Sequence, residues 1–593
     1  MSGSLFAFAL VLGGARSASA QGSISGTVSD SGTRAPVAGA VIVVSGTRLS
    51  ATSAVDGHYA IADVPAGSQT VQIRAIGYAA VQRGVLVTDG QAATADFSLR
   101  SRPIELDEIV ATGYGTQNRG DLTTAIGSVS GDQITGQPAA GLDAALKGKI
   151  AGVEIQTNAG NPGNAISVRI RGVASLTASG QPLFVIDGVP MSSKDLSQLD
   201  LGGQGINGVS GINPNDIETI DVLKDAAATA IYGSRGSNGV VLITTKRGVA
   251  GKPSVTFNSY AGTQSASRRV PLMDSKQYLE FFNEAAANDG YGDNYIGTPG
   301  VDDVINTDWQ DAVLRNAGVG NMELAVSGGN ESVRYRASGD YFGQKGIVLG
   351  SSYQRISSRV NLDFTASDKL TFKSSLAVAG EGNHRVESDG SGGGTITNAI
   401  GEAPIHLVKD GNRFTDPGAD NLEYDNPVAL ATLNRTRART LRVIGDIEAH
   451  WQLLPSISFT SRAGVDLSFL REYQFQSPQV LGTYAASANG VAKSAYTNFN
   501  NYVFDNYLTF DRAWGKSQLQ VTGGTSLEEG RGDFNFIRGE GLTSDQFDQV
   551  ANATVITSYD GYTYQNNLVS FFGRANYTLD GKYSVSGSIR TDA

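Results

Sequence analysis

Residues 182–190 read PLFVIDGVP, and residues 213–248 read NPNDIETIDVLKDAAATAIYGSRGSNGVVLITTKRG. In the first stretch, four apolar residues run into an Asp-Gly turn, which is typical of a short strand that ends in a tight turn. In the second stretch, an Asn-Pro-Asn turn precedes a strand-like run at 217–223, and an Ala-rich helical turn separates it from an apolar run at 240–243. Strands interleaved with helical turns predict an α/β unit.

These motifs occur together with ALKGKIAGV at residues 145–153 and VRIRG at residues 168–172. In this order, over about a hundred residues, they resemble the plug domain of TonB-dependent outer-membrane transporters of the SusC/RagA type. The resemblance implies a plug over residues 117–248, enclosed by a β-barrel. It assigns to the plug framework, without a ligand role, Arg169, Arg171, Gly172, Asp187, Gly188, Asn213, Pro214, Asp216, Tyr232, Gly233, Arg235 and Gly239.

Two cations, Lys246 and Arg247, end the last predicted plug strand. We expect them to pair with carboxylates on the barrel wall. An Asp that follows a strand usually caps a turn, and this is the interpretation for Asp187.

Composition excludes several classes of protein. Of 593 residues, 74 are Gly, only 16 are Pro and none is Cys, and the formal net charge is −11. Disulfides, zinc-thiolate sites and thiol nucleophiles are therefore excluded. A nucleic-acid partner is not expected, since it would need a basic face.

The N-terminus predicts a secretory signal peptide over residues 1–20. An apolar core at residues 5–12 precedes Ala18-Ser19-Ala20, an A-x-A cleavage pattern, although no Lys or Arg precedes Arg16. No other stretch approaches 18 consecutive apolar residues, so a membrane-spanning form of this chain would have to be a barrel.

Residues 22–100 alternate short apolar runs with Gly, Pro, Asp and Ser turns, which predicts a small β-sandwich. Strands are expected near 23–28, 40–44, 58–61, 70–76 and 94–99. The pattern is similar to the carboxypeptidase regulatory-like domain, a seven-stranded Ig-like sandwich that is not a peptidase.

Residues 101–116 form a predicted linker, RPIELDEIVATGYGT being its main part. Within it, one segment resembles the family's TonB box: Asp107, Glu108, Ile109, Val110, Ala111, Thr112 and Gly113. Such a box is an extended, flexible segment that adds as a strand to a sheet of the periplasmic partner. An ordinary linker is the alternative.

From residue 254 to residue 593 the chain changes to long runs in which apolar and polar residues alternate. Eleven strands are predicted, most close to the roughly 9–11 residues that a tilted membrane strand needs. Short turns alternate with long connections, as in outer-membrane barrels, whereas a soluble sandwich predicts no such regularity. The expected strands are 254–262, 320–328, 332–342, 355–365, 369–379, 441–453, 456–469, 500–511, 517–527, 568–578 and 582–590.

Alternation also predicts the two faces of this sheet. Charges on the lumen face are expected at Arg334, Arg336, Arg359, Asp363, Arg442, Asp446, Glu448, Arg462, Asp466 and Arg574, because a charge facing lipid is costly. Residues of an aromatic girdle are expected at Tyr260, Tyr341, Trp451, Trp514, Tyr577 and Tyr583. The fold class is therefore mainly β: a sandwich, an α/β plug and about eleven barrel strands, where the resemblance implies a barrel of 22. On this basis we expect a fragment of a longer barrel.

The resemblance implies TonB-dependent import of a nutrient, a glycan or an oligopeptide, across the outer membrane of a Gram-negative-type bacterium. The implied partners are the TonB–ExbB–ExbD complex, a SusD-like surface lipoprotein, outer-membrane lipid and a substrate of unknown identity, with the sandwich and TonB box in the periplasm. The alternative is a surface receptor or adhesin, or a siderophore or cobalamin receptor, that binds or signals without importing glycans. No cofactor, metal or catalytic set is expected. The HxxE spacing at His384–Glu387 lies in a Gly-rich loop and lacks an evident third ligand.

Overall fold

The computed structural model describes residues 21–593 except 76, 79, 101–108, 119–122, 136–140, 143–145, 158–159, 173–179, 207, 293–294, 388–392 and 417–423. The predicted signal peptide and the first two residues of the TonB-box-like segment, Asp107 and Glu108, lie outside the described residues. The chain divides into two compact units, Met1–Glu108 and Ile109–Ala593, and each is described by itself.

The first unit is a sandwich of two four-stranded sheets. One sheet joins β4 (His58–Val64) to β1 (Gly22–Asp30), which pairs in parallel with β7 (Ala92–Thr94) and then with β8 (Phe97–Leu99). The other sheet has the order β3-β2-β5-β6. Its strands are β3 (Ser50–Thr52), β2 (Val41–Val44), β5 (Gly67–Arg74) and β6 (Val81–Val87).

Alternate residues of both sheets fill the sandwich core, including Ile24, Val28, Ile42, Val71 and Ile73. The five predicted strands are present. The sequence did not predict β3 or β6, because Ser50–Thr52 is too short to alternate and the first half of β6 has three consecutive exposed residues, Gln82, Arg83 and Gly84, which interrupt the alternation.

The plug has a five-stranded sheet of order β11-β16-β17-β14-β15 and a separate hairpin, β12 with β13. Strands β14 (Leu183–Ile186) and β16 (Ile217–Leu223) have the predicted bounds, and β17 (Val240–Thr245) is two residues longer. The buried apolar residues of these strands form much of the plug core, including Ile186, Ile220 and Ile243. The remaining plug elements are β11 (Ile126–Ser130), α1 (Gly131–Thr135), β12 (Val153–Thr157), β13 (Ile166–Ile170), β15 (Val189–Met191), η2 (Gly208–Gly211), η3 (Pro214–Asp216), α3 (Ala226–Thr229) and η4 (Ala230–Gly236).

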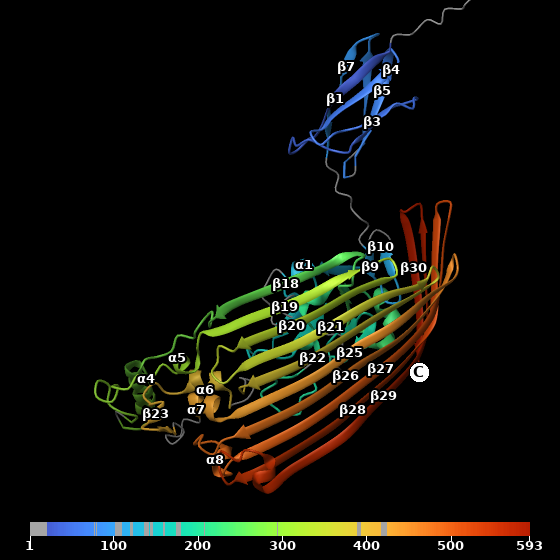
Figure 1. The fold of residues 1–593 in the computed structure, drawn as a ribbon. Coiled ribbons are helices and arrows are strands. Elements are labelled where there is room, and N and C mark those ends of the chain that lie inside the picture. The colour runs from blue at the N-terminus through green and yellow to red at the C-terminus, as the bar shows by residue number, and fades with distance from the viewer. Residues whose placement is uncertain are drawn as a thin grey trace, which may run out of the picture. The chain divides into compact units, whose positions relative to one another are not determined.

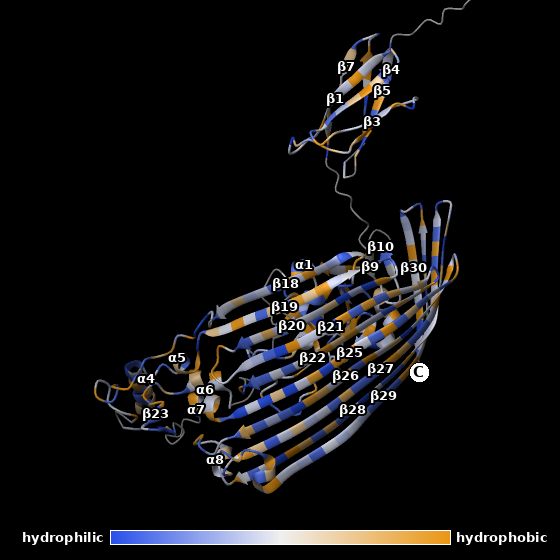
Figure 2. Cartoon of the chain, in the orientation of Figure 1, coloured by the Kyte–Doolittle hydropathy of each residue, from blue (hydrophilic) through white to orange (hydrophobic). Residues whose placement is uncertain are grey.

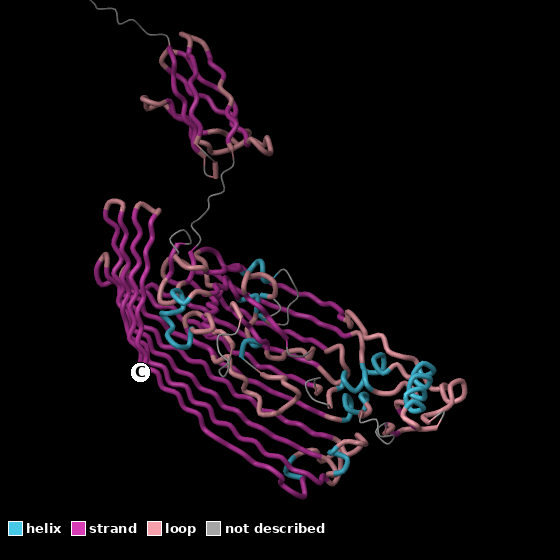
Figure 3. Tube along the Cα trace, turned by 180° about the vertical axis from the view of Figure 1, so that it is seen from behind, coloured by secondary structure: helices cyan, strands magenta, loops and turns pink. Residues whose placement is uncertain are grey.

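Eleven antiparallel strands form one large curved sheet, which confirms the predicted number and orientation. The plug lies against its concave face (Figures 1 and 3). Neighbours in the sheet follow the chain from β18 to β30, and these two strands are its edges. The strands are β18 (Gly251–Gln264), β19 (Ala317–Gly329), β20 (Val333–Lys345), β21 (Ser352–Ser367), β22 (Leu370–Arg385), β25 (Arg435–Leu454), β26 (Ile457–Gln476), β27 (Val491–Trp514), β28 (Ser517–Leu542), β29 (Ala553–Leu579) and β30 (Tyr583–Asp592).

Most of these strands are longer than predicted. β28 has 26 residues and β29 has 27, where the alternation predicted about eleven. The outer face of β28 is apolar at Leu519, Val521 and Leu527 and then becomes charged at Glu529 and Arg531. The ladder to β29 continues through this change. The apolar–polar alternation that predicted the strand therefore stops at the end of the apolar band, whereas the backbone pairing of the strand continues beyond it. Figure 2 shows this mixed hydropathy along the strands.

Short turns connect strands at one end of the sheet, at 330–332, 368–369, 455–456, 515–516 and 580–582. The long connections lie at the opposite end and carry helices α4–α8 (Figure 1). Because the strands extend further than predicted, the long connections are shorter than predicted: 265–316, 386–434, 477–490 and 543–552. They contain α4 (Ser275–Asn288), α5 (Trp309–Val313), α6 (Thr395–Gly401), α7 (Pro427–Leu433), α8 (Tyr484–Ser487), η6 (Val550–Asn552) and the small strands β23 (Lys409–Asp410) and β24 (Arg413–Phe414).

One girdle assignment was wrong. Tyr260 stands opposite Asn321 in the ladder, and Asn321 is buried on the inner face, where its amide donates to the carboxylate of Asp340. Tyr260 therefore faces the lumen, and an aromatic near a strand end did not by itself indicate its face. The other five girdle residues are exposed. Among the described residues, the structure contains no helix with the length and apolar character needed to cross a membrane.

Candidate functional site

The inner face of the large sheet meets the plug through ion pairs. Plug residues Asp187 and Asp216 pair with wall residues Arg359 and Arg336, each at 3.3 Å. Two further pairs join the plug to the wall, Arg247 with Asp363 and Arg235 with Glu528. The predicted pairing of Arg247 with a wall carboxylate is confirmed. At Lys246 it is the backbone carbonyl that contacts the wall, accepting from the Asn361 amide at 2.7 Å.

Asp187 lies in the turn after β14, and its carboxylate binds the neighbouring strand β17 and the wall. It follows β14 with φ +47°, and its carboxylate accepts from the backbone N–H and the hydroxyl of Thr245 at 3.0 and 2.7 Å. The same carboxylate accepts from Arg359. Gly188, with φ +92°, lies so close to the wall that a Cβ there would collide with the Arg462 guanidinium. A residue pair assigned to the framework thus also sets how closely the plug approaches the wall.

The Asn-Pro-Asn turn has a similar double role. The Asn213 side chain caps η3 by accepting from the backbone N–H of Asn215 at 3.1 Å, and Pro214 takes the first position of the turn, where no N–H is needed. This geometry presents Asp216 to the wall, where it accepts from the Ser338 hydroxyl at 2.6 Å as well as from Arg336.

Other framework residues act inside the plug. Arg171 has φ +56° and pairs with Asp225, whose pKa is held below its usual range by the hydrogen bond from the Ala125 N–H and by Arg171. Arg169 lies on β13 opposite Glu154. Gly172 and Gly239 have positive φ. Gly233 also has positive φ, but it faces the wall, where a Cβ would collide with Asp592 of β30.

Sequence reasoning missed a second group of plug–wall contacts, made by residues 192–198. The backbone N–H of Ser192 donates to Asp466 at 3.1 Å, and that of Gln198 donates to Glu472 at 2.7 Å. Both carboxylates are themselves held by wall arginines, Arg442 and Arg385. The Ser197 hydroxyl also donates to Glu472 at 2.6 Å. The wall carboxylates in strand alternation were the main available signal, because a backbone N–H has no residue code and a single Ser in a loop is not distinctive.

The described part of the TonB-box-like segment is strand β9 (Ile109–Ala111), which pairs with β10 (Thr116–Asn118) in a hairpin. The hairpin lies at the short-turn end of the sheet (Figure 1). Thr112 and Gly113 follow β9, and the Thr112 carbonyl accepts from Arg574 of β29 at 2.8 Å. Arg574 also donates to the Gln117 side chain at 3.2 Å.

Tyr114 lies in the turn of this hairpin, and the sequence analysis did not identify it as a functional residue. Its ring stacks on Phe572 of the wall with centroids 4.1 Å apart, and contacts Tyr507 of the wall at 5.6 Å and Tyr232 of the plug at 6.1 Å. Its hydroxyl lies 3.4 Å from the Asp505 carboxylate. Burial and this carboxylate raise the pKa of Tyr114 above its ordinary value.

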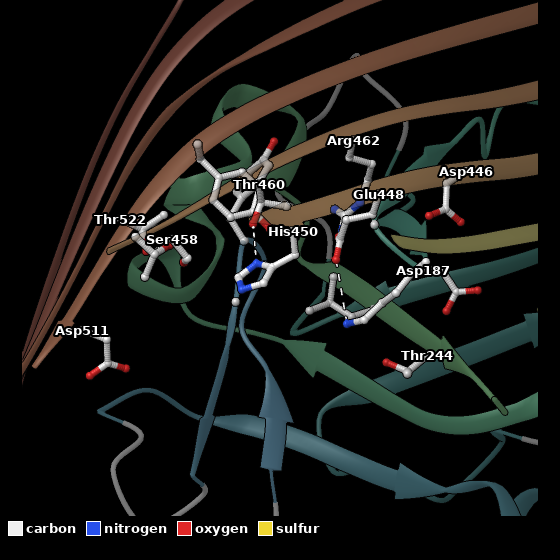
Figure 4. A pocket seen from close by; sticks show the side chains of 18 of the residues that line it. Asp187, Thr244, Asp446, Glu448, His450, Ser458, Thr460, Arg462, Asp511 and Thr522 are labelled. Atoms are coloured by element: carbon white, nitrogen blue, oxygen red, sulfur yellow. Dashed lines mark hydrogen bonds and ion pairs between the residues drawn. The ribbon is translucent and has the colours of Figure 1, made fainter. Parts of the chain in front are cut away.

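A cavity of about 760 Å³ lies beside Tyr114, between the plug and strands β22 to β28. Figure 4 shows its hydroxyl and charged side chains, with Glu448 and Arg462 directed toward one another and His450 hydrogen-bonded to Thr460 at 3.0 Å. The lining includes Pro455 and Ser456 of a short turn, so the cavity lies toward that end of the sheet. Within the described residues, no three His, Asp or Glu side chains gather in a way that could hold a metal ion.

Comparison with known proteins agrees with this arrangement. Residues 118–240 match the TonB-dependent Receptor Plug Domain, and residues 23–100 match the Carboxypeptidase regulatory-like domain. The chain is 31% identical over 99% of its length to TonB-dependent receptor P3 of Formosa agariphila, and 30% identical over 96% to TonB-dependent receptor SusC of Bacteroides thetaiotaomicron. The chain belongs to the SusC/RagA-type TonB-dependent receptors. It spans 56% of the length of each of these two relatives, about half.

The receptor also shares its fold with a solved structure. The RagAB peptide importer in its open-open state superposes with a TM-score of 0.69 at 24% identity, over 82% of this chain and 56% of that one. Receptors of this type are outer-membrane β-barrel proteins with the plug and N-terminal domain on the periplasmic side. Outer-membrane barrels have short periplasmic turns and longer extracellular loops. By this rule, the short-turn end of the receptor, with the β9–β10 hairpin, is the periplasmic end, and helices α4–α8 lie at the extracellular end.

Proposed function

We propose that the receptor takes part in TonB-dependent import of a nutrient, a glycan or an oligopeptide, across the outer membrane. The observation that carries the proposal is the plug–wall interface, which has the TonB-box-like segment at its periplasmic end. Its ion pairs and hydrogen bonds are interspersed with small apolar clusters, such as Leu196 with Leu470 and Phe499. Ion pairs and hydrogen bonds of this kind can be exchanged for water one after another when the plug is displaced. A large apolar interface would instead have to be exposed as a whole.

The two substrate classes have different support. RagAB, whose fold the receptor shares, is a peptide importer. The glycan class is what the resemblance to SusC-type transporters implies. A SusD-like lipoprotein on the cell-surface side and the TonB–ExbB–ExbD complex on the periplasmic side are the partners that this proposal requires. Helices α5, α6 and α7 pack around the buried Trp309, whose indole N–H donates to the Ala403 carbonyl at 2.8 Å. They give such a lipoprotein an ordered surface to meet.

The test replaces residues 107–112 by an alternating Gly-Ser sequence of the same length in the receptor in its outer membrane. Uptake of fluorescent maltoheptaose and of labelled casein peptides is then measured in cells with and without TonB. We expect import of one probe class that is lost both in the variant and in cells without TonB. The matched control replaces residues 100–105 in the same way, outside the TonB-box-like segment, and should keep import.

Surface binding of the probe is measured in the same cells and distinguishes import from the alternative. Binding that persists in the variant while uptake stops supports import. Equal uptake with and without residues 107–112 would contradict the proposal. Binding without uptake in every strain would point to a surface receptor or adhesin instead.

A further inference from the structure

We propose that Tyr114 is a latch that holds the TonB-box-like segment against the barrel wall, and that pulling on this segment releases the ring and opens the adjacent cavity. The latch rests on the proposed function, since it assigns a positioning residue to TonB-dependent import. The latch can nevertheless be tested without measuring import, because release of the segment would make it more accessible to a labelling reagent in solution.

The first argument is that the Tyr114 ring joins three separate parts of the receptor. Phe572 on β29 and Tyr507 on β27 belong to the wall, whereas Tyr232 on η4 belongs to the plug. The ring packs at the edge of the buried cluster that contains Val185, Leu242 and Phe572. Aromatic pairs in such geometry stabilise beyond their buried area, so this small contact is strong for its size.

The second argument is that the backbone around Tyr114 is built to insert this ring. Gly113 and Gly115 flank it with φ +98° and +156°. A Cβ on Gly113 would lie 3.0 Å from Ile231 and 3.3 Å from Tyr232, so a side chain there would push the turn away from the plug. The hydroxyl of Thr112 and its N–H both donate to the Gly115 carbonyl, which closes the turn.

Arg574 fixes the hairpin next to this ring. It reaches from the wall to the Thr112 carbonyl and to the Gln117 side chain, one on each side of Tyr114. These two hydrogen bonds are partly buried. A force on β9 acts first on Thr112 and then on the ring that follows it two residues later, so the ring is the last strong contact of the segment.

The third argument comes from the cavity. Gly113, Tyr114 and Gly115 line it together with Tyr232 and Tyr507. Withdrawal of the ring therefore adds the space it occupied to a cavity of about 760 Å³ at the periplasmic end of the plug. Much of the lining consists of hydroxyl, amide and charged groups, such as Ser458, Thr509 and Gln520, which suits the passage of a hydrated polar solute.

The test uses the absence of cysteine from the chain. A single reporter, Val110→Cys on β9, is labelled with a membrane-impermeant maleimide in outer-membrane vesicles that lack TonB and expose their periplasmic face. We expect Tyr114→Ala to raise the labelling rate about tenfold, because loss of the ring contacts shifts the segment toward its released state. Tyr114→Phe keeps the ring and should label close to the parent rate, and Phe572→Ala should behave like Tyr114→Ala.

A second reporter separates a latch from general loss of plug stability. Ser167 is half-buried on β13 in the plug. The Ser167→Cys reporter should be labelled at the same rate in the parent and in the Tyr114→Ala variant. A rise at both reporters would overturn the latch, as would an unchanged rate at Val110→Cys. Because the vesicles contain no TonB and receive no substrate, these outcomes stand whether or not the receptor imports the probes named above.

Discussion

At the scale of single residues, Gly188 and Gly172 form a matched pair. Their φ angles are +92° and +91°, but Gly188 faces Arg462 of the wall, whereas nothing lies within 4 Å of a Cβ on Gly172. Alanine at either position has the backbone cost of a positive φ, about 1–3 kcal/mol. Only Gly188→Ala must also displace Arg462 from its pair with Glu448.

We therefore expect the plug of Gly188→Ala to be cleaved several-fold faster than that of Gly172→Ala by a protease added to the periplasmic face of outer-membrane vesicles. The comparison removes the backbone effect common to both variants. Equal cleavage rates would mean that close approach at Gly188 does not hold the plug. The sequence indicated the turn at Asp187-Gly188 from local chemistry alone, but not the wall residue that lies over it.

At the scale of elements, strand β27 crosses two environments on one outer face. Leu508, Phe504 and Tyr502 are exposed apolar residues, and Ser494 is an exposed polar residue nearer the cell-surface end. Arginine facing lipid near the bilayer midplane costs about 2–4 kcal/mol, and near an interface about 0–1 kcal/mol. We expect Leu508→Arg to lower the free energy of unfolding by the larger amount and Ser494→Arg by the smaller one.

Urea unfolding in lipid vesicles, followed by the change in gel mobility between the folded and unfolded barrel, measures both variants. Similar losses for both would show that the lipid band extends to Ser494, and a negligible loss for Leu508→Arg would place Leu508 outside lipid.

The same strand shows why the elements were predicted only in part. The apolar alternation identified β27, but its upper half has polar residues on both faces, for example Asn498 on the outer face and Asn501 on the inner face, and it pairs regardless.

Helix α4 was missed although its start has a readable local signal. The Asp274 carboxylate accepts from the Gln277 N–H at 2.9 Å, and the Gln277 side chain accepts from the Asp274 N–H at 3.1 Å, which is a capping box. Because this region lies between two predicted strands, it was predicted to be a long loop without helices. The capping box therefore indicated a helix that the pattern of strands and connections did not predict.

At the scale of the whole molecule, the sequence predicted that the plug meets the lumen face of the sheet, but it did not predict which residues pair across this interface. Charges on alternate strand positions indicated a polar lumen, and motifs of the plug indicated what fills it. The pairs themselves, such as Asp216 with Arg336, join residues more than a hundred positions apart, and no local pattern encodes such a distance. Tyr114 was missed for the same reason, since its partners Tyr507 and Phe572 lie in strands that form far along the chain.

The pair of Arg247 with Asp363 tests whether such contacts hold the plug in the receptor as a whole. Arg247 follows β17, where the chain leaves the plug for β18, and both side chains are mostly buried. Reversing one charge, in Arg247→Asp or Asp363→Arg, places two like charges together and should loosen the plug. The double reversal restores opposite charges, so a coupling of about 1–3 kcal/mol is expected in the double-mutant cycle.

The measurement is the urea concentration at which the plug becomes protease-sensitive in vesicles, for the parent, both single variants and the double variant. Added salt should weaken the effect of the single reversals, since it screens charges that are not fully buried. If the double variant is as loose as the sum of the singles, the pair does not contribute to docking, and the other plug–wall contacts hold the plug.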